Sequence, residues 1–341
     1  MRKYRKQEHI ENYLRATYQG DPLFKDVFIE HYSMPDFAYD DIDTGMTFMG
    51  KDIAFPLMIN AITGGTDFAE TINRNLAQLA KDFKIPMAVG SQTIAIEDDD
   101  AIESFAVVRE IIGSQGLVFA NINGLLGLEE AKKAVDMIGA DALQIHLNPG
   151  QELIMEEGDR DFRSIRKNIR DIVQGLDLPV IVKEVGFGMS PKVIQDLYDL
   201  GVRTIDLAGF GGTNFFEVEN LRYPEEDFSE LFNWGNPTAL CLLWAREMKK
   251  DDLTLVGSGG IRGAEDCLKA LALGADICAM SGELLNYLIH GGYDYAAEFL
   301  SQLMHKMKIL MMLTNCKKIQ DIHDLSFSIK GDLKDLYEGR Q

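Results

Sequence analysis

The stretch PLMINAITGG, from Pro56 to Gly65, is a short apolar run followed by a polar, glycine-rich ending. Seven further stretches have the same organisation: PMAVGSQT (86–93), GLVFANIN (116–123), ALQIHLNPGQE (142–152), PVIVKEVGFG (179–188), RTIDLAGFGGTNF (203–215), LTLVGSGGIR (253–262) and DICAMSGE (276–283). Short apolar runs are typical of buried parallel strands. Eight of them predict an α/β fold, a TIM (β/α)8 barrel whose polar strand ends line one mouth.

The segments between these runs support that interpretation. Residues 69–83, 127–139, 190–201 and 263–275 have helical patterns, and several of them stop at a glycine. We therefore expect one barrel domain over residues 1–341, with an N-terminal extension (1–50) over the mouth and C-terminal helices (283–341). The extension begins with a predicted helix over 8–18, and the acidic stretch 36–45 with the following TFMGKDIAFP (47–56) suggests a short strand or hairpin before the barrel. The link from Gly209 to about Asp252 is the longest and suggests a lid or binding loop.

Composition excludes several classes of protein. The formal net charge of the 341 residues is −20, which disfavours nucleic acid and anionic lipid as partners. No apolar run approaches the ~20 residues of a membrane span, and residues 1–19 lack the apolar core of a secretory signal. Four cysteines without CxxC spacing disfavour a disulfide framework or a structural zinc site. We expect an acidic, cytoplasmic enzyme with a small-molecule substrate.

Glycine-rich loops follow the last three predicted strands. GSGGIR contains Ser258, Gly259 and Gly260, MSGE follows the next strand, and GFGGT (209–213) precedes both. Phosphate groups in β/α barrels are often held after strands seven and eight, where glycine lets backbone N–H groups approach the anion. Either motif alone could be an ordinary tight turn, but together they favour an anion site.

Two strand ends carry other chemistry. HLNPGQE supplies His146, Asn148, Gln151 and Glu152; a carboxylate and amide oxygens suit Mg²⁺, and His146 could donate to phosphate oxygens. The alternative is a simple Asn-Pro-Gly turn. Lys183 ends an apolar strand and could direct its ammonium into the mouth, although an ion pair with Glu184 is the structural alternative.

The cluster RKQEHI, residues 5–10, is basic in an acidic protein. Arg5, Lys6 and His9 could hold a diphosphate if the N-terminus folds over the mouth. Taken alone, the cluster is better explained as a solvated helix start.

Together, RKQEH, INAITGG, VGSQ, LQIHLNPGQE, VKEVGFG, GFGGTNF, GSGGIR and LALGAD closely resemble the type 2 isopentenyl-diphosphate delta-isomerases over nearly the whole chain. The resemblance implies a barrel that binds FMN, requires Mg²⁺, and converts isopentenyl diphosphate to dimethylallyl diphosphate. Reduced FMN would be the acid-base catalyst, NADPH would serve only to reduce it, and the protein would be a homo-oligomer.

The resemblance also implies roles for individual residues. Those expected to contact the flavin are Ala61, Ile62, Thr63, Ser91, Asn121, Lys183, Thr213, Ser258, Gly259, Gly260, Ala279 and Met280. Those expected to contact the diphosphate substrate are Arg5, Lys6, His9, Ser91, His146, Asn148 and Gln151, with Glu152 on the metal. Gln151, Lys183, Glu219 and His146 are the expected catalytic residues, and Glu219 in particular could assist proton transfer.

Three positions depart from the expected family pattern: Gln7 replaces an acid, Thr93 replaces a basic residue that helps hold the diphosphate, and Ala208 replaces a serine. A flavin-dependent oxidoreductase is the first rival, but its His-Arg pair in an HxGxR arrangement is absent from the sequence after strands six and seven. A non-catalytic flavin- or phosphate-binding scaffold is the second, and it leaves RKxEH and HxNxxQE unexplained.

Overall fold

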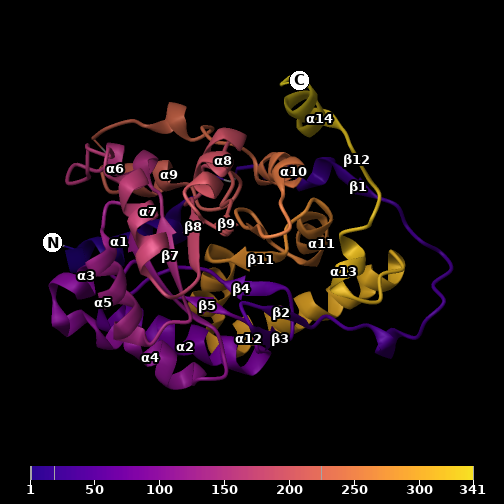
Figure 1. Cartoon of the computed structure of the whole chain (residues 1–341), viewed down its shortest axis with the longest axis horizontal. Coiled ribbons are helices and arrows are strands. Elements are labelled where there is room, and N and C mark those ends of the chain that lie inside the picture. Colours follow the sequence, from indigo (N-terminus) through magenta and orange to yellow (C-terminus); the bar gives the residue numbers. More distant parts are fainter. Residues whose placement is uncertain (1, 19, 224, 341) are drawn as a thin grey trace.

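A computed structural model describes residues 2–18, 20–223 and 225–340, with only the backbone for residues 2–5 and 7. Eight parallel strands close into a barrel in the order β10-β11-β4-β5-β6-β7-β8-β9 (Figure 1). Their bounds are β4 Leu57–Ile59, β5 Met87–Ala88, β6 Val118–Asn123, β7 Ala142–His146, β8 Val180–Lys183, β9 Thr204–Asp206, β10 Thr254–Gly257 and β11 Ile277–Met280. All eight lie within the predicted stretches, so the barrel prediction is confirmed.

Helices surround the barrel and cover its mouth. They are α1 Arg2–Arg15, α2 Asp67–Phe83, α3 Thr93–Glu97, α4 Glu103–Ile112, α5 Leu128–Ile138, α6 Pro149–Ile154, α7 Ile165–Gly175, α8 Pro191–Asp199, α9 Phe215–Asn220, α10 Thr238–Met248, α11 Ala264–Ala272, α12 Gly282–Leu313, α13 Ile319–Ile322 and α14 Gly331–Glu338. Short 3-10 turns are η1 Phe24–Asp26, η2 Tyr39–Asp41, η3 Asp99–Ala101 and η4 Ser229–Leu231. The first helix thus begins and ends earlier than the predicted 8–18.

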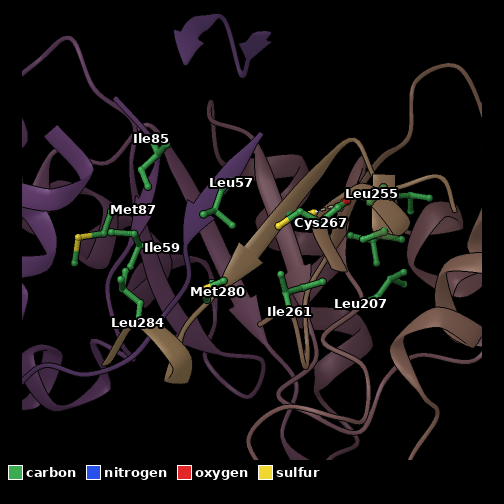
Figure 2. Close-up of a cluster of buried hydrophobic side chains, with 14 of the residues drawn as sticks. Leu57, Ile59, Ile85, Met87, Leu207, Leu255, Ile261, Cys267, Met280 and Leu284 are labelled. Atoms are coloured by element: carbon green, nitrogen blue, oxygen red, sulfur yellow. Dashed lines mark hydrogen bonds between the residues drawn. The ribbon is translucent and has the colours of Figure 1, made fainter. Parts of the chain in front are cut away.

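The core has two apolar layers because side chains alternate along each strand. Leu57, Ile59 and Met87 belong to the outer layer, which packs against the helices; Figure 2 shows part of this layer, with Met280 and Leu255 from neighbouring strands. The inner layer fills the barrel with residues such as Met58 and Phe119. The parallel strands are therefore buried on both faces, as their continuous apolar runs require.

Polar residues replace the apolar inner layer toward the C-terminal ends of the strands. Two residues beyond Met58 comes Asn60, and two residues beyond Phe119 comes Asn121, on the same face of each strand. The other members of this upper layer are Gln144, Lys183, Asp206 and Ser258, and all six side chains are buried. The alternation therefore places an apolar floor under a polar mouth.

Two small sheets lie outside the barrel. The predicted hairpin consists of β2 Met46–Phe48 and β3 Lys51–Ile53, and its Phe48 and Ile53 join the inner cluster, so it closes the end opposite the mouth. The second sheet pairs β1 Val27–Ile29 with β12 Phe327–Ile329, which places part of the N-terminal extension beside the C-terminal segment (Figure 1). Among the described residues, no helix is both long and apolar enough to cross a membrane.

Candidate functional site

A cavity of about 1010 Å³ opens at the C-terminal ends of the barrel strands. Residues that follow all eight strands line it, together with residues of α1 and of the segment after β9. The predicted site residues found on its wall are Lys6, His9, Ala61, Ile62, Thr63, Ser91, Asn121, His146, Asn148, Gln151, Glu152, Lys183, Thr213, Ser258, Gly259, Gly260, Ala279 and Met280. The fold thus brings residues from distant parts of the sequence to one surface.

Two predicted residues need separate mention. Arg5 lies in α1, but its side chain is outside the described part of the chain. Glu219 is completely buried and is not among the described residues that line the cavity.

The glycine loops after β9 and β10 pack backbone against backbone. Gly259 has a φ of 94°, and a Cβ there would lie 2.0 Å from the carbonyl oxygen of Gly209. Gly260 has a φ of 76°, and a Cβ there would lie 2.6 Å from the carbonyl oxygen of Gly211. Only glycine meets both conditions, so this rim of the cavity is formed by main chain, as an anion site requires. The nearby helices α11 and α12 begin at Ala264 and Gly282, each within one residue of the helical ranges predicted from 263 and from 283.

Thr63 and Lys183 carry polar atoms on the cavity wall. The Oγ1 atom of Thr63 is buried and has no hydrogen-bond partner, which suits a hydroxyl that contacts a ligand. Lys183 donates to the backbone carbonyl of Glu184 at 2.6 Å. The carboxylate of Glu184 instead accepts the backbone N–H groups of residues 185–188. The structural alternative of a Lys183–Glu184 side-chain ion pair is therefore not what holds this loop.

Helix α6 arranges the amides and the carboxylate of HLNPGQE. Asn148 precedes the helix and donates from Nδ2 to Gln151 Oε1 at 3.2 Å and to Glu152 Oε1 at 3.0 Å. The other oxygen of Glu152 accepts the backbone N–H of Asp159 at 3.0 Å. Gln151 donates from Nε2 to Glu219 Oε1 at 2.7 Å. The motif is thus a rigid cluster rather than a simple turn.

Glu219 lies behind this cluster and connects it to α1. His9 Nε2 lies 2.8 Å from Glu219 Oε1, and Arg222 Nη1 lies 2.7 Å from Glu219 Oε2. Burial raises the pKa of the Glu219 carboxyl, but His9, Gln151 and Arg222 outweigh it and hold the pKa below its ordinary value. The carboxylate is therefore ionised at neutral pH and orients Gln151 and His9.

His146 is neutral in this environment. Burial lowers the pKa of the imidazole to about 3, with further lowering by the ammonium groups of Lys183 and Lys6. Its Nδ1 lies 2.7 Å from Asn121 Oδ1.

Helix α1 closes one side of the cavity. Lys6 donates to the backbone carbonyl of Ser91 at 3.2 Å, and the hydroxyl oxygens of Ser91 and Thr93 lie 3.0 Å apart. The predicted helix start of RKQEHI is therefore a wall of the cavity. The segment directly after α1 is held by α9, because Glu217 Oε1 accepts the backbone N–H groups of Thr17 and Tyr18 at 2.8 and 3.0 Å.

Sequence reasoning missed several residues of this region. Arg262 lines the cavity and donates to the backbone carbonyl of Gly211 at 2.7 Å. Arg222 joins Glu219, Glu157 and Glu8, while Asn60, Gln144 and Asp206 form the buried layer under the mouth. The available signal was a polar residue inside or at the end of an apolar strand: Asn after PLMI, Gln in ALQI and Asp in TID.

A family model described as FMN-dependent dehydrogenase matches residues 124–328, more than half of the chain. The isopentenyl-diphosphate delta-isomerase of Listeria monocytogenes serotype 4b (strain F2365) is 39% identical over 98% of this chain and 93% of its own length. The protein of the same name from Geobacillus sp. (strain WCH70) is 42% identical over 96% and 93%.

Solved structures share the fold. A flavocytochrome b2 variant with sulfite bound has a TM-score of 0.69 at 16% identity and covers 94% of this chain, with 82% of its own chain matched. A mandelate oxidase variant with a monooxide FMN adduct has a TM-score of 0.61 at 17% identity, covering 94% and 92%. The sequence matches are much closer and extend over almost the full chain. The chain therefore belongs to the type 2 isopentenyl-diphosphate delta-isomerase family of enzymes.

Proposed function

We propose that this chain interconverts isopentenyl diphosphate and dimethylallyl diphosphate at the cavity above the barrel, by a 1,3-allylic proton shift in isoprenoid biosynthesis. One observation carries the proposal: main-chain glycine loops, a buried unpartnered hydroxyl and the α6 amide-carboxylate cluster face one cavity beneath α1. The first two suit a phosphate-bearing cofactor, and the third suits a second, smaller anion.

The cavity fits FMN. Its volume of about 1010 Å³ exceeds what a drug-sized ligand requires. Gly259 and Gly260 would hold the phosphate of FMN. Thr63 and Asn121 would form hydrogen bonds with the flavin ring, and Lys183 would place its ammonium near the negative charge of the ring. Reduced FMN, when bound, would supply the acid-base group for the proton shift. NADPH would serve as the reductant that prepares it and would not be consumed in each turnover.

The residues of α1 and α6 would hold the substrate. Lys6 and His9 would contact the diphosphate from above, while Asn148 and Gln151 would face it from the side. Gln151 is held by Glu219 on one side and Asn148 on the other, so its amide is ready to orient the five-carbon tail. Closure by α1 would exclude water from the reacting carbons.

Glu152 would bind Mg²⁺ with the substrate phosphates. No group of three or more His, Cys, Asp or Glu side chains placed to bind a metal occurs among the described residues. Mg²⁺ often uses one or two carboxylates, with waters and phosphate oxygens as its remaining ligands, so one buried carboxylate fits this mode. Glu152→Gln is expected to weaken diphosphate binding at least tenfold while FMN stays bound. Calorimetric titration of each ligand measures both; loss of FMN would refute the assignment.

We further propose that the enzyme works in the cytoplasm as a homo-oligomer. Its four cysteines are buried free thiols, which suits a reducing compartment. Ile309 and Leu313 of α12 are each 38% exposed and offer an apolar contact for a second copy. Sedimentation velocity of the purified protein measures the subunit number, and a monomer at all concentrations would contradict the proposal.

The deciding experiment is an anaerobic NMR assay of isopentenyl diphosphate with purified protein, FMN, Mg²⁺ and dithionite or NADPH. We expect dimethylallyl diphosphate only when the flavin is reduced, with no lasting consumption of NADPH. Protein that holds reduced FMN and yields no product would refute the isomerase function. Steady NADPH consumption would favour the oxidoreductase, and inactivity with all substrates would favour the scaffold.

A further inference from the structure

A chain of hydrogen bonds crosses the polar layer of the barrel from His146 to Asp206. His146 Nδ1 lies 2.7 Å from Asn121 Oδ1, and Asn121 Nδ2 lies 3.0 Å from Gln144 Oε1. Gln144 Nε2 lies 2.9 Å from Asn60 Oδ1, and Asn60 Nδ2 lies 2.6 Å from Asp206 Oδ2. The three amides and Asp206 are each at most 3% exposed. Strands β4, β6, β7 and β9 therefore contribute one continuous polar path.

The direction of this chain is fixed at Asn60. A backbone N–H can only donate, and that of Ala61 donates to Asn60 Oδ1 at 2.9 Å, so Asn60 must turn its NH2 group toward Asp206 Oδ2 and present its oxygen to Gln144. The other oxygen of Asp206 accepts the hydroxyl of Ser258 at 2.5 Å.

The order of donor and acceptor at Asn60 also fixes the orientation of the two remaining amides. Because Asn60 presents its oxygen, Gln144 must donate from Nε2 and present Oε1 to Asn121. Asn121 then donates from Nδ2 and presents Oδ1 to His146. The partner of an amide oxygen must be a donor, so His146 carries its proton on Nδ1.

We propose that Asp206, acting through Asn60, Gln144 and Asn121, holds His146 as the Nδ1–H tautomer, with the lone pair of Nε2 available to the cavity. Asp206 is a positioning residue in this assignment, because it acts on His146 through three other side chains. In this assignment Nε2 accepts a hydrogen bond, from a protonated oxygen or from a water, whereas the sequence predicted that His146 donates to phosphate oxygens. Only this consequence for the substrate rests on the proposed function; the tautomer does not.

Nitrogen-15 NMR of protein labelled at its six histidines tests the proposal without substrate. Protonated and unprotonated ring nitrogens give well-separated shifts, and His146→Gln identifies the signals of His146 by their loss. His290 serves as an internal reference, because its Nδ1 lies 2.9 Å from the backbone carbonyl of Asn286. At pH 8 we expect a protonated Nδ1 and an unprotonated Nε2 for His146.

Asp206→Asn removes the charge with little change of shape and allows the chain to reverse. Hydrogen bonds to charged groups are about twice as strong as neutral ones, so the Nε2–H population is expected to rise about tenfold. Ser258→Ala is the matched control: it removes the hydroxyl that donates to Asp206 Oδ1, leaves the amide chain in place, and should leave the His146 tautomer unchanged. Circular dichroism reports the folding of each variant.

Two outcomes overturn the proposal: an Nε2–H tautomer in the parent protein, or an unchanged His146 spectrum in folded Asp206→Asn. If that variant does not fold, Gln144→Met breaks the same chain at its centre, and it too must release the tautomer. Failure of the isomerase assay would leave the NMR result intact, so the two proposals fail separately.

Discussion

Two effects lower the pKa of the His146 imidazole: burial and the neighbouring ammonium groups both disfavour its charged form. Its folded pKa of about 3 lies below the ordinary 6.5, so the unfolded chain binds the proton first. Stability is therefore lost as the pH falls below about 6.5 toward 3.

His146→Gln removes this titration. As the pH falls from 8 to 5, the parent protein should lose about 1 to 2 kcal/mol more of its free energy of unfolding than the variant does. The expected loss is set at this modest level because the His146 ring is half-buried. Urea denaturation of both proteins without ligands at the two pH values measures the difference. A constant difference would mean that the imidazole titrates alike in the folded and unfolded states.

The sequence identified the residues at the ends of the strands, but not the residues that hydrogen-bond to them and hold their side chains in place. Asn148, Gln151 and Glu152 follow a strand in a motif rich in chemistry, so their position at the mouth could be predicted. The contacts of the Glu219 carboxylate with Gln151 and His9 could not be predicted, because they depend on how α9 packs against α1 and α6. The contacts among Asn60, Gln144 and Asp206 likewise depend on barrel closure, which places side chains from distant strands within hydrogen-bond distance.

At the scale of elements, the loop after β10 offers a matched pair of glycines. Gly259→Ala adds a Cβ 2.0 Å from a backbone oxygen at a φ of 94°, and the main chain cannot move without displacing the loop after β9. We expect a loss of about 3 kcal/mol or more in stability and at least tenfold weaker FMN binding. Gly263→Ala is the control, because nothing lies within 4 Å of its Cβ position. Thermal denaturation and flavin fluorescence titration compare them; equal behaviour would refute the packing argument.

The attachment of α1 to α9 gives a second prediction at this scale. Glu217 is buried and accepts the backbone N–H groups of Thr17 and Tyr18. Glu217→Ala should reduce the hydrogen-exchange protection of these two amides about 10- to 100-fold, since bonds to a charged acceptor contribute about 1.5–3 kcal/mol. Glu8→Ala removes the ion pair between the exposed Glu8 and Arg222, and should change the protection of these two amides less than about threefold. Unchanged protection in Glu217→Ala would show that other contacts hold α1.

The elements themselves were predicted to different degrees. The eight barrel strands were found because strands buried on both faces leave continuous apolar runs. The first helix was placed at 8–18 instead of Arg2–Arg15, because its first turns are polar and basic and carry little apolar periodicity. Its position on the cavity wall depends on tertiary contacts with Ser91 and Glu217 that no local pattern records.

At the scale of the whole molecule, the C-terminal segment packs on residues 24–29 of the N-terminal extension. Strand β1 pairs only with β12 in its sheet, and the carboxylate of Asp26 accepts the backbone N–H of Leu333 at 3.2 Å. Phe24, Val27 and Leu333 are each at most 2% exposed. Removal of residues 326–341 would expose this cluster and leave β1 as an open edge.

We expect that truncation to lower the free energy of unfolding by about 3 to 6 kcal/mol, from the lost burial of these three side chains, and Tm by roughly 5 °C or more. FMN binding at low temperature should persist, because no described residue of the cavity wall lies beyond Asn286. Removal of residues 339–341 is the control, since it keeps β12 and α14. Calorimetry and flavin titration separate the two effects. Loss of FMN binding in folded, truncated protein would mean that the C-terminal segment shapes the cavity through the barrel, whereas an unchanged Tm would mean that β1 and η1 are stable without it.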